Sequence, residues 1–201
     1  SAKGTIEVTV TKAWEDTQEQ QDKRPTEITA IITGTLETEN DIVRPETIKA
    51  SEGWTKTITN LPKYDSNGNE IEYTLAEERV NDFYQLKEIT GDQVSGFTIT
   101  NEFILPDDTV DITVTKAWED TAEQQDRRPA EVTVVVSGNG KTERYNVKAS
   151  EGWTYTFTNL PEYDSNGNEI VYTVTEEGSY EFYELKEITG DVETGFTITN
   201  K

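Results

Sequence analysis

The sequence of 201 residues contains no cysteine, no histidine and no methionine. These absences exclude disulfides, zinc–thiolate sites, haem ligation and every catalytic dyad that needs an imidazole. No apolar run approaches the length of a membrane span, so we expect no membrane insertion in this segment. We predict no metal and no cofactor. A secreted protein can lack cysteine if something other than a disulfide stabilises its fold.

Positive charge is also scarce. Lysine and arginine together number 18, against 40 aspartate and glutamate residues, which gives a formal net charge of −22. Such a surface repels phosphate backbones and anionic membranes, so it argues against a nucleic-acid or lipid-surface role and favours solubility. We expect a monomer with no nucleic-acid partner.

The chain consists of two near-copies of one segment. Three motifs occur in both copies: VTVTKAWEDT at 8–17, with one change at 112–121; YDSNGNEI at 64–71 and 163–170; and GFTITN at 96–101 and 195–200. The repeat predicts two domains of ordinary size, 1–103 and 109–201, joined by a short linker at 104–108. The copies differ in length only within 33–47, which predicts a surface hairpin loop there.

Alternation of apolar and polar residues with a period of two dominates both copies. In the first copy five strands are predicted, with the sequences IEVTVTKAW, EITAIITG, GWTKTITNL, IEYTLAE and GFTITN. Asn67-Gly68 and Asn166-Gly167 predict hairpin turns between apolar runs. The polar segments 15–25 and 119–129 are typical of an ordered loop or an irregular turn. Short strands separated by turns favour an all-β fold, with one β-sandwich in each copy.

Three of the apolar strand faces carry one polar residue each. Alternation places Lys12, Glu77 and Asn101 on inward faces, whereas the neighbouring Glu78 points outward. The second copy repeats the pattern with Lys116, Glu176 and Asn200, beside the outward Glu177. Taken singly, such a lysine is compatible with an ammonium that reaches water, and the glutamate and asparagine with turn caps.

If the three side chains meet in the core, they can react. Desolvation lowers the pKa of a lysine and raises that of a glutamate, which favours a neutral amine beside a neutral acid. A neutral amine is a nucleophile, and a protonated carboxyl can polarise the asparagine carbonyl and pass a proton to departing ammonia. We hypothesise a Lys–Asn isopeptide bond that forms once, without turnover.

VTVTKAW, the Arg-Pro that follows it, GWTKTITNLPKYDSNGNEIEYTLAE and GFTITN resemble the Cna B-type domains of Gram-positive surface adhesins and pilins. The resemblance covers nearly all of both copies. It implies a sandwich of inverse immunoglobulin type in each copy, with an autocatalytic Lys–Asn bond between the first and last strands and an acidic residue assisting from a central strand. The match places these roles on Lys12, Asn101 and Glu77, and on Lys116, Asn200 and Glu176.

The resemblance also implies a function. The chain is expected to be a structural stalk or spacer in a secreted protein attached to the cell wall of a Gram-positive bacterium. Its expected partners are neighbouring repeat domains and, through another domain, a host extracellular-matrix ligand. A pilin polymerisation motif and an LPxTG sorting signal are both absent from the sequence, so the stalk role and wall attachment rest on the resemblance.

Two other classes of function stay open. A ligand-binding adhesin module for a host protein or glycan needs exposed aromatic residues or a groove, and the similarity of the two copies argues against it. A turnover enzyme such as a glycosidase has ample carboxylates here but no recognisable catalytic pair.

Other candidate sites have simpler interpretations. Asp65, Asn67 and Asn69 are spaced like a calcium loop, but glycine is at position 68 instead of the sixth loop position, which favours a turn. The acidic stretch 15–22 is compatible with weak calcium binding or, more simply, with a solvated loop. The four tryptophans allow a sugar-binding platform, but core packing fits two of them better. We expect six aromatic residues in the core near the triads: Trp14, Tyr73, Phe97, Trp118, Tyr172 and Phe196.

Overall fold

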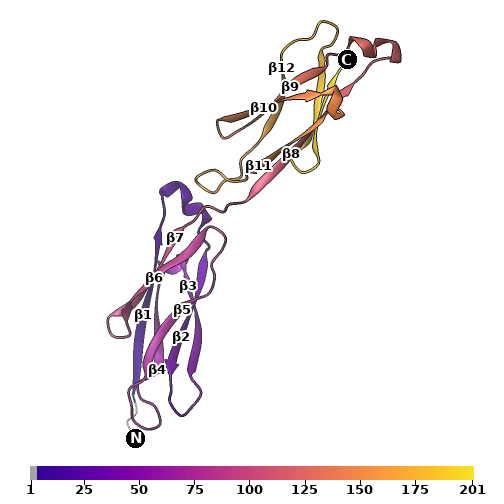
Figure 1. Ribbon diagram of the computed structural model, residues 1–201. Helices are drawn as coiled ribbons and strands as arrows, with labels where there is room; N and C mark the ends of the chain where they lie inside the picture. The colour runs from indigo at the N-terminus through magenta and orange to yellow at the C-terminus, as the bar shows by residue number, and fades with distance from the viewer. Residues whose placement is uncertain (1–3) are drawn as a thin grey trace. The chain divides into compact units, whose positions relative to one another are not determined.

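The computed structural model describes residues 4–201, so residues 1–3 of the predicted first domain lie outside the described part (Figure 1). The chain divides into two compact units, with the boundary between Pro106 and Asp107. Helical structure in the described part is limited to short 3-10 helices. No helix within 4–201 is both long enough and apolar enough to cross a membrane.

Seven strands form the first unit: β1 (Thr5–Glu15), β2 (Glu27–Thr35), β3 (Ile42–Lys49), β4 (Thr55–Pro62), β5 (Glu72–Glu77), β6 (Tyr84–Asp92) and β7 (Gly96–Phe103). They make two sheets, in the orders β4-β1-β7-β6 and β3-β2-β5. Inward residues from both sheets, such as Val10, Ile32 and Ile99, are fully buried in one core between them. The unit is therefore a β-sandwich.

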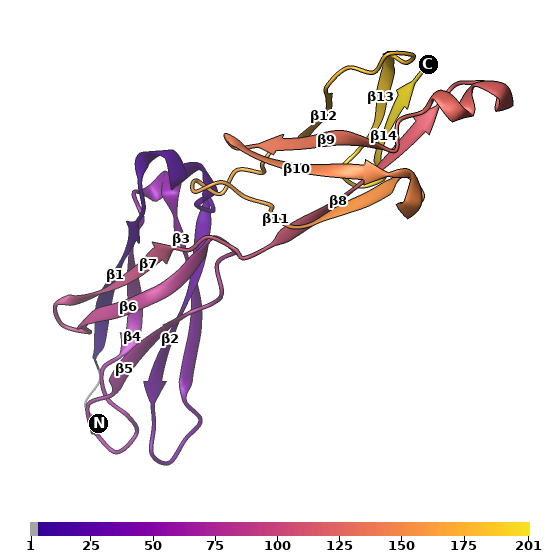
Figure 2. The ribbon, with the colours of Figure 1, turned by 45° about the horizontal axis from the view of Figure 1, so that its top comes forward.

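The second unit repeats this architecture with β8 (Thr109–Trp118), β9 (Glu131–Gly138), β10 (Lys141–Lys148), β11 (Thr154–Pro161), β12 (Thr173–Glu177), β13 (Leu185–Asp191) and β14 (Gly195–Asn200). Its sheets have the orders β11-β8-β14-β13 and β10-β9-β12 (Figure 2). The prediction of two tandem all-β sandwiches is confirmed.

The first and last strands of each unit lie side by side. In the first unit β1 pairs with β7 in parallel, while both of the other pairings in that sheet are antiparallel. The register puts Lys12 opposite Ile99 and Trp14 opposite Asn101. Lys12 and Asn101 are therefore diagonal neighbours on adjacent strands and share the inward face. The β8–β14 pair of the second unit has the equivalent register.

Each unit contains two strands that the alternation did not predict. The additional strands of the first unit, β3 and β6, are edge strands of their sheets, as β10 and β13 are in the second. Pro45 lies within β3, a position that only an edge strand tolerates readily. Most β6 residues are exposed, so this strand has no continuous apolar face to produce an alternating pattern.

The Asn-Gly turns are not hairpins between paired strands. The turn at Asn67-Gly68 connects β4 in one sheet to β5 in the other, and only Tyr64 and Glu70 form a bridge across it. The Asp65 carboxylate stabilises the turn by accepting hydrogen bonds from the backbone N–H groups of Asn67 and Asn69, at 2.9 and 2.8 Å. The backbone also closes the turn, since the Asp65 and Ile71 N–H groups donate to the Asn69 and Lys63 carbonyls at 2.9 Å. The predicted turn is therefore present, but its ladder ends at this short bridge because β4 and β5 pair in different sheets.

The length difference between the copies lies where the sequence placed it. The β2–β3 hairpin of the first unit has a loop at 36–41, whereas Asn139 and Gly140 alone join β9 to β10. Both of these turn residues have positive φ values, 52° and 72°, as a tight two-residue hairpin requires. The predicted surface hairpin is confirmed by these pairings.

The polar segments after the first strand of each unit contain 3-10 helices, η1 (Gln18–Lys23) and η3 (Ala122–Arg127). Shorter ones, η2 (Ala50–Glu52) and η4 (Ala149–Glu151), precede β4 and β11. At the start of η1 the Gln20 side chain accepts a hydrogen bond from the Thr17 backbone N–H at 3.0 Å, and Gln124 does the same for Thr121. The ordered loop that the sequence predicted is thus a capped helical turn.

Gly91 tests the packing of the β6–β7 hairpin that leads to Asn101. Its φ is +90°, and a Cβ at this position would lie 2.0 Å from the Gly96 carbonyl oxygen. We expect Gly91→Ala to lower the free energy of unfolding of the first unit by about 2 kcal/mol or more in urea titrations. Gly53→Ala is the control, since its φ is +72° but its Cβ would meet nothing within 4 Å. Equal losses in the two variants would contradict this account of the hairpin.

Candidate functional site

Lys12 is a lysine buried in an apolar strand. It is 4% exposed, and its backbone N–H donates to the Trp54 carbonyl at 2.8 Å. Its Nζ donates to the Ala13 carbonyl at 2.6 Å and to the Ile99 carbonyl at 3.5 Å. Nζ also lies 3.7 Å from the centroid of the Trp14 ring. Lys12 therefore turns inward, between the first and last strands, and the water-exposed alternative is wrong.

Asn101 lies on the neighbouring strand β7 and is fully buried. On its other side β7 pairs with β6, and the register of that pair shifts between Leu86 and Glu88, next to Asn101. The second unit has the same irregularity beside Asn200, between Leu185 and Glu187. Bulges of this kind redirect side chains and occur often beside functional sites.

Glu77 reaches the same region from the opposite sheet. It is the last residue of β5, where it pairs with Ala30 of β2. Its inward position contrasts with Glu78, which is exposed. The amine, the carboxyl and the carboxamide thus come from three strands and from both layers of the sandwich.

The second unit gives the distances within the triad. Asn200 Nδ2 donates to Glu176 Oε1 at 2.8 Å, and Lys116 Nζ lies 4.0 Å from Glu176 Oε2. The side chains of Lys116 and Glu176 are only 0% and 5% exposed. Lys116 Nζ also donates to the carbonyls of Ala117 and Ile198, at 2.7 and 3.2 Å. The carboxyl therefore lies between the amine and the carboxamide and contacts both.

Buried polar atoms without a hydrogen-bond partner are concentrated at these two places. Within residues 4–201, seven buried side-chain atoms have none: Trp14 Nε1, Glu77 Oε2, Asn101 Nδ2 and Oδ1, Trp118 Nε1, Glu176 Oε2 and Asn200 Oδ1. All belong to the two triads or to the tryptophans beside them. Most buried polar groups in folded proteins are hydrogen-bonded, so such a concentration requires a chemical explanation.

Burial shifts the pKa values of Lys12, Lys116 and Glu77 in the direction that favours their neutral forms. Desolvation lowers the pKa of Lys12 from 10.5 to about 8, although the Glu77 carboxylate opposes the shift. The pKa of Lys116 falls to about 8 for the same reason, against Glu176. Burial also raises the pKa of Glu77 above 4.5. The nearby Asn101 carboxamide limits this rise, although its atoms make no hydrogen bond of ordinary geometry.

Of the six aromatic residues expected near the triads, the two tryptophans contact the lysines. Lys116 Nζ lies 4.0 Å from the Trp118 ring centroid, as Lys12 does at 3.7 Å from that of Trp14. Tyr73 and Tyr172 lie four residues before the glutamates, and Phe97 and Phe196 four residues before the asparagines. Four residues of strand span about 13 Å, so these four side chains pack in the cores further from the triads. Tyr73 instead donates its hydroxyl to the Pro62 carbonyl at 2.6 Å.

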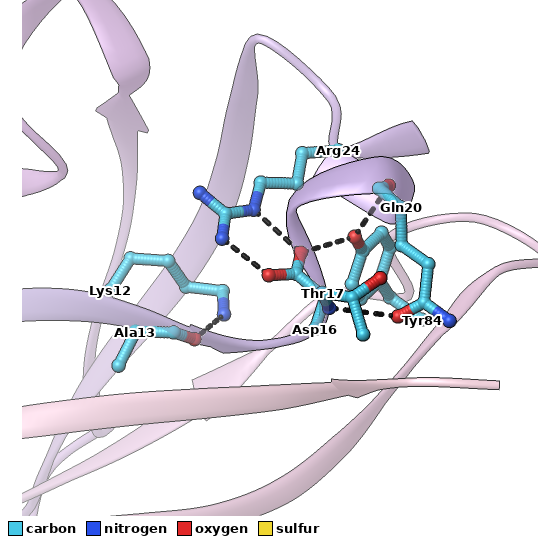
Figure 3. Close-up of polar contacts among 7 residues, drawn as sticks. All are labelled: Lys12, Ala13, Asp16, Thr17, Gln20, Arg24 and Tyr84. Carbon is cyan, nitrogen blue, oxygen red and sulfur yellow. Dashed lines mark hydrogen bonds and ion pairs between the residues drawn. The ribbon is translucent and has the colours of Figure 1, made fainter. Parts of the chain in front are cut away.

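A second polar cluster, which sequence reasoning missed, lies directly beside Lys12 and Trp14. We call it the clamp; it consists of Asp16, Arg24 and Tyr84 (Figure 3). Arg24 donates Nε and Nη2 to the two Asp16 carboxylate oxygens at 2.7 and 2.6 Å, and the Tyr84 hydroxyl donates to Asp16 Oδ2 at 2.5 Å. The Asp16 side chain is 1% exposed. The acidic stretch 15–22 is thus partly an anchored turn and not simply a solvated loop.

The clamp recurs in the second unit as Asp120, Arg128 and Tyr183. The Arg128 nitrogens lie 2.8 and 2.6 Å from the Asp120 oxygens, and the Tyr183 hydroxyl lies 2.5 Å from Oδ2. Hydrogen bonds from Arg128 and Tyr183 outweigh desolvation and lower the pKa of Asp120 to about 2. The Arg-Pro in each copy was a sequence signal for this cluster, but it did not indicate the aspartate or the tyrosine.

The tryptophan that accepts the Lys12 backbone hydrogen bond has an unusual conformation. Trp54 has a φ of 58° and its counterpart Trp153 one of 60°, in the left-handed region that bulky residues avoid. The Trp54 ring packs edge-on against Trp14, with centroids 5.1 Å apart. Backbone strain of this kind persists only where the surrounding structure enforces it. Here the strained residue, Trp54, is hydrogen-bonded directly to the backbone of Lys12.

The calcium alternatives gain no support from the geometry. The Asp65 carboxylate is already engaged by the backbone of its own turn. Within residues 4–201, no group of three or more acidic side chains is arranged to hold a metal ion.

Comparison with known proteins agrees with this architecture. The family model described as the Cna protein B-type domain matches residues 8–102 and 112–201. The chain belongs to the Cna protein B-type domain family. Its two matched segments correspond to the two sandwiches described above.

A collagen adhesin from Staphylococcus aureus is 32% identical over 199 residues, which cover 98% of this chain and 16% of that protein. The chain therefore spans about one sixth of the length of this relative.

Among solved structures, a single B repeat unit of the collagen-binding surface protein of Staphylococcus aureus is 28% identical. The match covers 98% of both chains, with a TM-score of 0.42. A Mobiluncus mulieris adhesin described as containing intramolecular disulfide, isopeptide and ester bond cross-links is 11% identical, over 98% of this chain and 96% of that one, with a TM-score of 0.30. Family membership rests on the sequence matches and not on these structural similarities.

The low pKa of the two buried lysines can be measured in a chain that cannot cross-link. We expect the Lys12 and Lys116 Cε resonances of an Asn101→Ala, Asn200→Ala variant to titrate near pH 8 in NMR experiments, because burial disfavours the ammonium. The exposed Lys87 and Lys186, whose pKa values are raised by hydrogen bonds to Glu15 and Glu119, serve as internal controls. Since the unfolded chain binds the extra proton between about pH 8 and 10.5, these lysines should also make folding more favourable as pH rises through that window. Titration of both lysines with the controls would contradict the burial argument.

Proposed function

We propose that each unit forms an intramolecular isopeptide bond, Lys12 to Asn101 in the first and Lys116 to Asn200 in the second, assisted by Glu77 and Glu176. The observation that carries the proposal is the burial of an amine, a carboxyl and a carboxamide together, with unpartnered polar atoms in both copies and direct contacts through Glu176 in the second. Forming the amide removes the buried amine and frees ammonia, so the costly unpaired groups become a neutral bond.

The reaction is an amide exchange. The lysine Nζ attacks Cγ of the asparagine, the new Nζ–Cγ bond forms, and the Cγ–Nδ2 bond breaks. The glutamic acid donates its proton towards the departing nitrogen and accepts one from the attacking amine, so it ends as it began. Ammonia leaves and no oxidant or cofactor is consumed. In the second unit Glu176 contacts both Lys116 and Asn200, which is the arrangement that this proton transfer requires.

The altered pKa and the fixed geometry together explain why an unactivated amide reacts. With a pKa of about 8, about one Lys12 side chain in ten is neutral at pH 7, against fewer than about one in a thousand at the ordinary 10.5. Holding the reacting groups together supplies about 7–11 kcal/mol in well-oriented intramolecular reactions. The sandwich provides this orientation because β1 and β7 are adjacent and β5 faces them.

The position of the bond fits a load-bearing role. A pull on the two ends of a unit reaches β1 and β7 first, and these strands are parallel neighbours. A bond from Lys12 to Asn101 would carry the tension directly between them and leave the chain from 13 to 100 unloaded. By analogy with disulfides, closing a loop of this length stabilises the fold by about 4–5 kcal/mol. Without cysteine, this stabilisation is independent of the redox conditions outside the cell.

We therefore infer that the chain is a stalk or spacer segment of a bacterial surface adhesin or pilin, on the surface of a Gram-positive cell. The collagen adhesin of Staphylococcus aureus, of which this chain matches a small part, supports such a placement. Attachment to the cell wall and recognition of a matrix ligand belong, in this proposal, to other parts of the parent protein. The segment acts by bonding once and then resisting force, and not by turnover.

Glu77→Gln is the first test of the bond. The unaltered chain should be lighter than its sequence mass by two ammonia molecules, and the variant by one, because an amide cannot shuttle the proton. Tryptic mapping should find Lys12 joined to Asn101 only in the unaltered chain. The first unit of the variant should lose about 4–5 kcal/mol of stability, which lowers its melting temperature by roughly 20 °C or more.

Glu78→Gln is the matched control, since Glu78 is adjacent but exposed. It should keep both bonds and its melting temperature. A full mass deficit in the Glu77→Gln protein would show that another group is the acid, and no deficit in the unaltered chain would overturn the bond itself.

Single-molecule pulling tests the stalk role. When the unaltered protein is pulled by its two ends, its extension should show no step from the segments 13–100 and 117–199, because the two bonds close these segments into loops. The Glu77→Gln, Glu176→Gln variant should show two steps of about 300 Å, because each releases nearly ninety residues of extended chain. Large unfolding steps in a chain whose mass confirms both bonds would refute the proposed load path.

A further inference from the structure

The clamp has a geometry that a simple loop anchor does not require. Asp16 follows Lys12 and Trp14 at the two-residue spacing of β1, and Arg24 and Tyr84 both reach it from other elements. The Arg24 guanidinium carbon lies 5.6 Å from the Trp14 ring centroid, and the Tyr84 ring packs edge-on against the same indole at 4.8 Å. Trp14 is thus held by two members of the clamp and in turn contacts the reacting amine.

We propose that Arg24 and Arg128 are positioning residues for the cross-link: clamped by aspartate and tyrosine, each guanidinium fixes the tryptophan over the lysine and holds its own positive charge near the amine. This inference rests on the proposed isopeptide bond and adds a group that touches neither reacting atom.

The clamp also connects the strands that carry the two reactants. Asp16 directly follows β1, the strand of Lys12. Tyr84 is the first residue of β6, and β6 pairs Leu86 with Asn101 at the bulge in that ladder. The Tyr84 hydroxyl lies 2.5 Å from Asp16 Oδ2 and 3.2 Å from the Gln20 carbonyl. A displacement of the clamp would therefore change the position of the amine relative to the carboxamide.

Burial makes the clamp rigid. The Asp16 side chain is 1% exposed and that of Arg24 is 23% exposed, while Tyr84 is 3% exposed as a residue. Burial alone would raise the pKa of Asp16, but the Arg24 and Tyr84 hydrogen bonds lower it below its ordinary value. Asp16 is therefore a carboxylate at neutral pH, and a bidentate fork holds the guanidinium in one orientation.

The charges that face Lys12 come from three places. Glu77 on β5 and Asp16 after β1 raise the lysine pKa, whereas Arg24 after η1 lowers it, in addition to the larger effect of desolvation. Around Lys116 the corresponding charged groups are Glu176, which raises the pKa, and Arg128, which lowers it. The tryptophan face favours an ammonium, so a neutral amine there needs both the exclusion of water and a nearby positive charge.

The test compares the two units within one chain. The 201-residue chain is purified unfolded from inclusion bodies in denaturant and diluted into native buffers from pH 5 to 10. Each bond is followed by mass spectrometry of quenched tryptic digests. Arg24→Gln should slow the Lys12–Asn101 bond by about tenfold or more relative to the Lys116–Asn200 bond in the same molecules. The alkaline limb of its pH profile should move to higher pH, because the amine loses a neighbouring positive charge.

Three variants separate positioning from general stability. Arg128→Gln should slow the second bond and leave the first unchanged. Arg24→Lys keeps the charge but loses the fork, so the rate should fall while the alkaline limb stays in place. Tyr84→Phe keeps the ring against Trp14 and removes the hydroxyl bond to Asp16. This variant should still fold, but its Lys12–Asn101 bond should form more slowly than in the unaltered chain.

The outcomes are distinguishable. The inference would be overturned if Arg24→Gln left the ratio of the two bond-forming rates and both pH profiles as they are in the unaltered chain. This holds even if the first unit of the variant melted at lower temperature. If Arg24→Gln did not fold, an unchanged rate in Tyr84→Phe would overturn it equally. If the Lys116–Asn200 bond did not form in a chain whose second unit carries no substitution, the proposed cross-link itself would be rejected, whatever the role of the clamp.

Discussion

The burial of one lysine amine between two sheets, beside a carboxyl and a carboxamide, is the constraint on which the rest of this protein depends. Removing an ion from water costs several kcal/mol, and the core of a unit of roughly one hundred residues has little stability to spare. In the second unit Lys116 and Glu176 are nevertheless almost completely buried, 4.0 Å apart. A fold that keeps such groups inside must either neutralise them or bond them. The proposed amide exchange does both, because it turns a desolvated amine into an amide.

The comparison of the two units separates what this constraint requires from what it leaves free. The tryptophan over the lysine, the clamp and the strained tryptophan recur with nearly the same geometry, and the triad residues occupy equivalent strand positions. Edge features differ. In the first unit the Gln93 side chain accepts from the Tyr73 backbone N–H and donates to the Ile71 carbonyl, whereas Val192 occupies the equivalent position and offers neither bond. The β2–β3 and β9–β10 loops also differ in length. The parts that agree are those that surround the buried lysine, glutamate and asparagine.

The strand order is the feature that supports the proposed mechanical role of the cross-link. Because the first and last strands are parallel neighbours, a single bond between them joins the two points at which force enters and leaves a unit. The acidic, cysteine-free composition is compatible with this role, since a high net charge favours solubility and the proposed cross-link would not depend on oxidation. Loads on successive units would then pass through covalent bonds rather than through hydrogen-bonded ladders.

The sequence by itself determined the two copies, the central strands and the inward faces of Lys12, Glu77 and Asn101. These depend on a period-two pattern that any half-buried strand imposes on its own residues. It did not determine the edge strands β3 and β6, which lack a continuous apolar face, or that the strands on either side of the Asn-Gly turn pair in different sheets. Only the tertiary structure brought Glu77 across the sandwich to the other two residues and joined Asp16 to Arg24 and Tyr84. Contacts between sheets and between distant loops are set by how whole layers pack, and a local pattern contains no information about that packing.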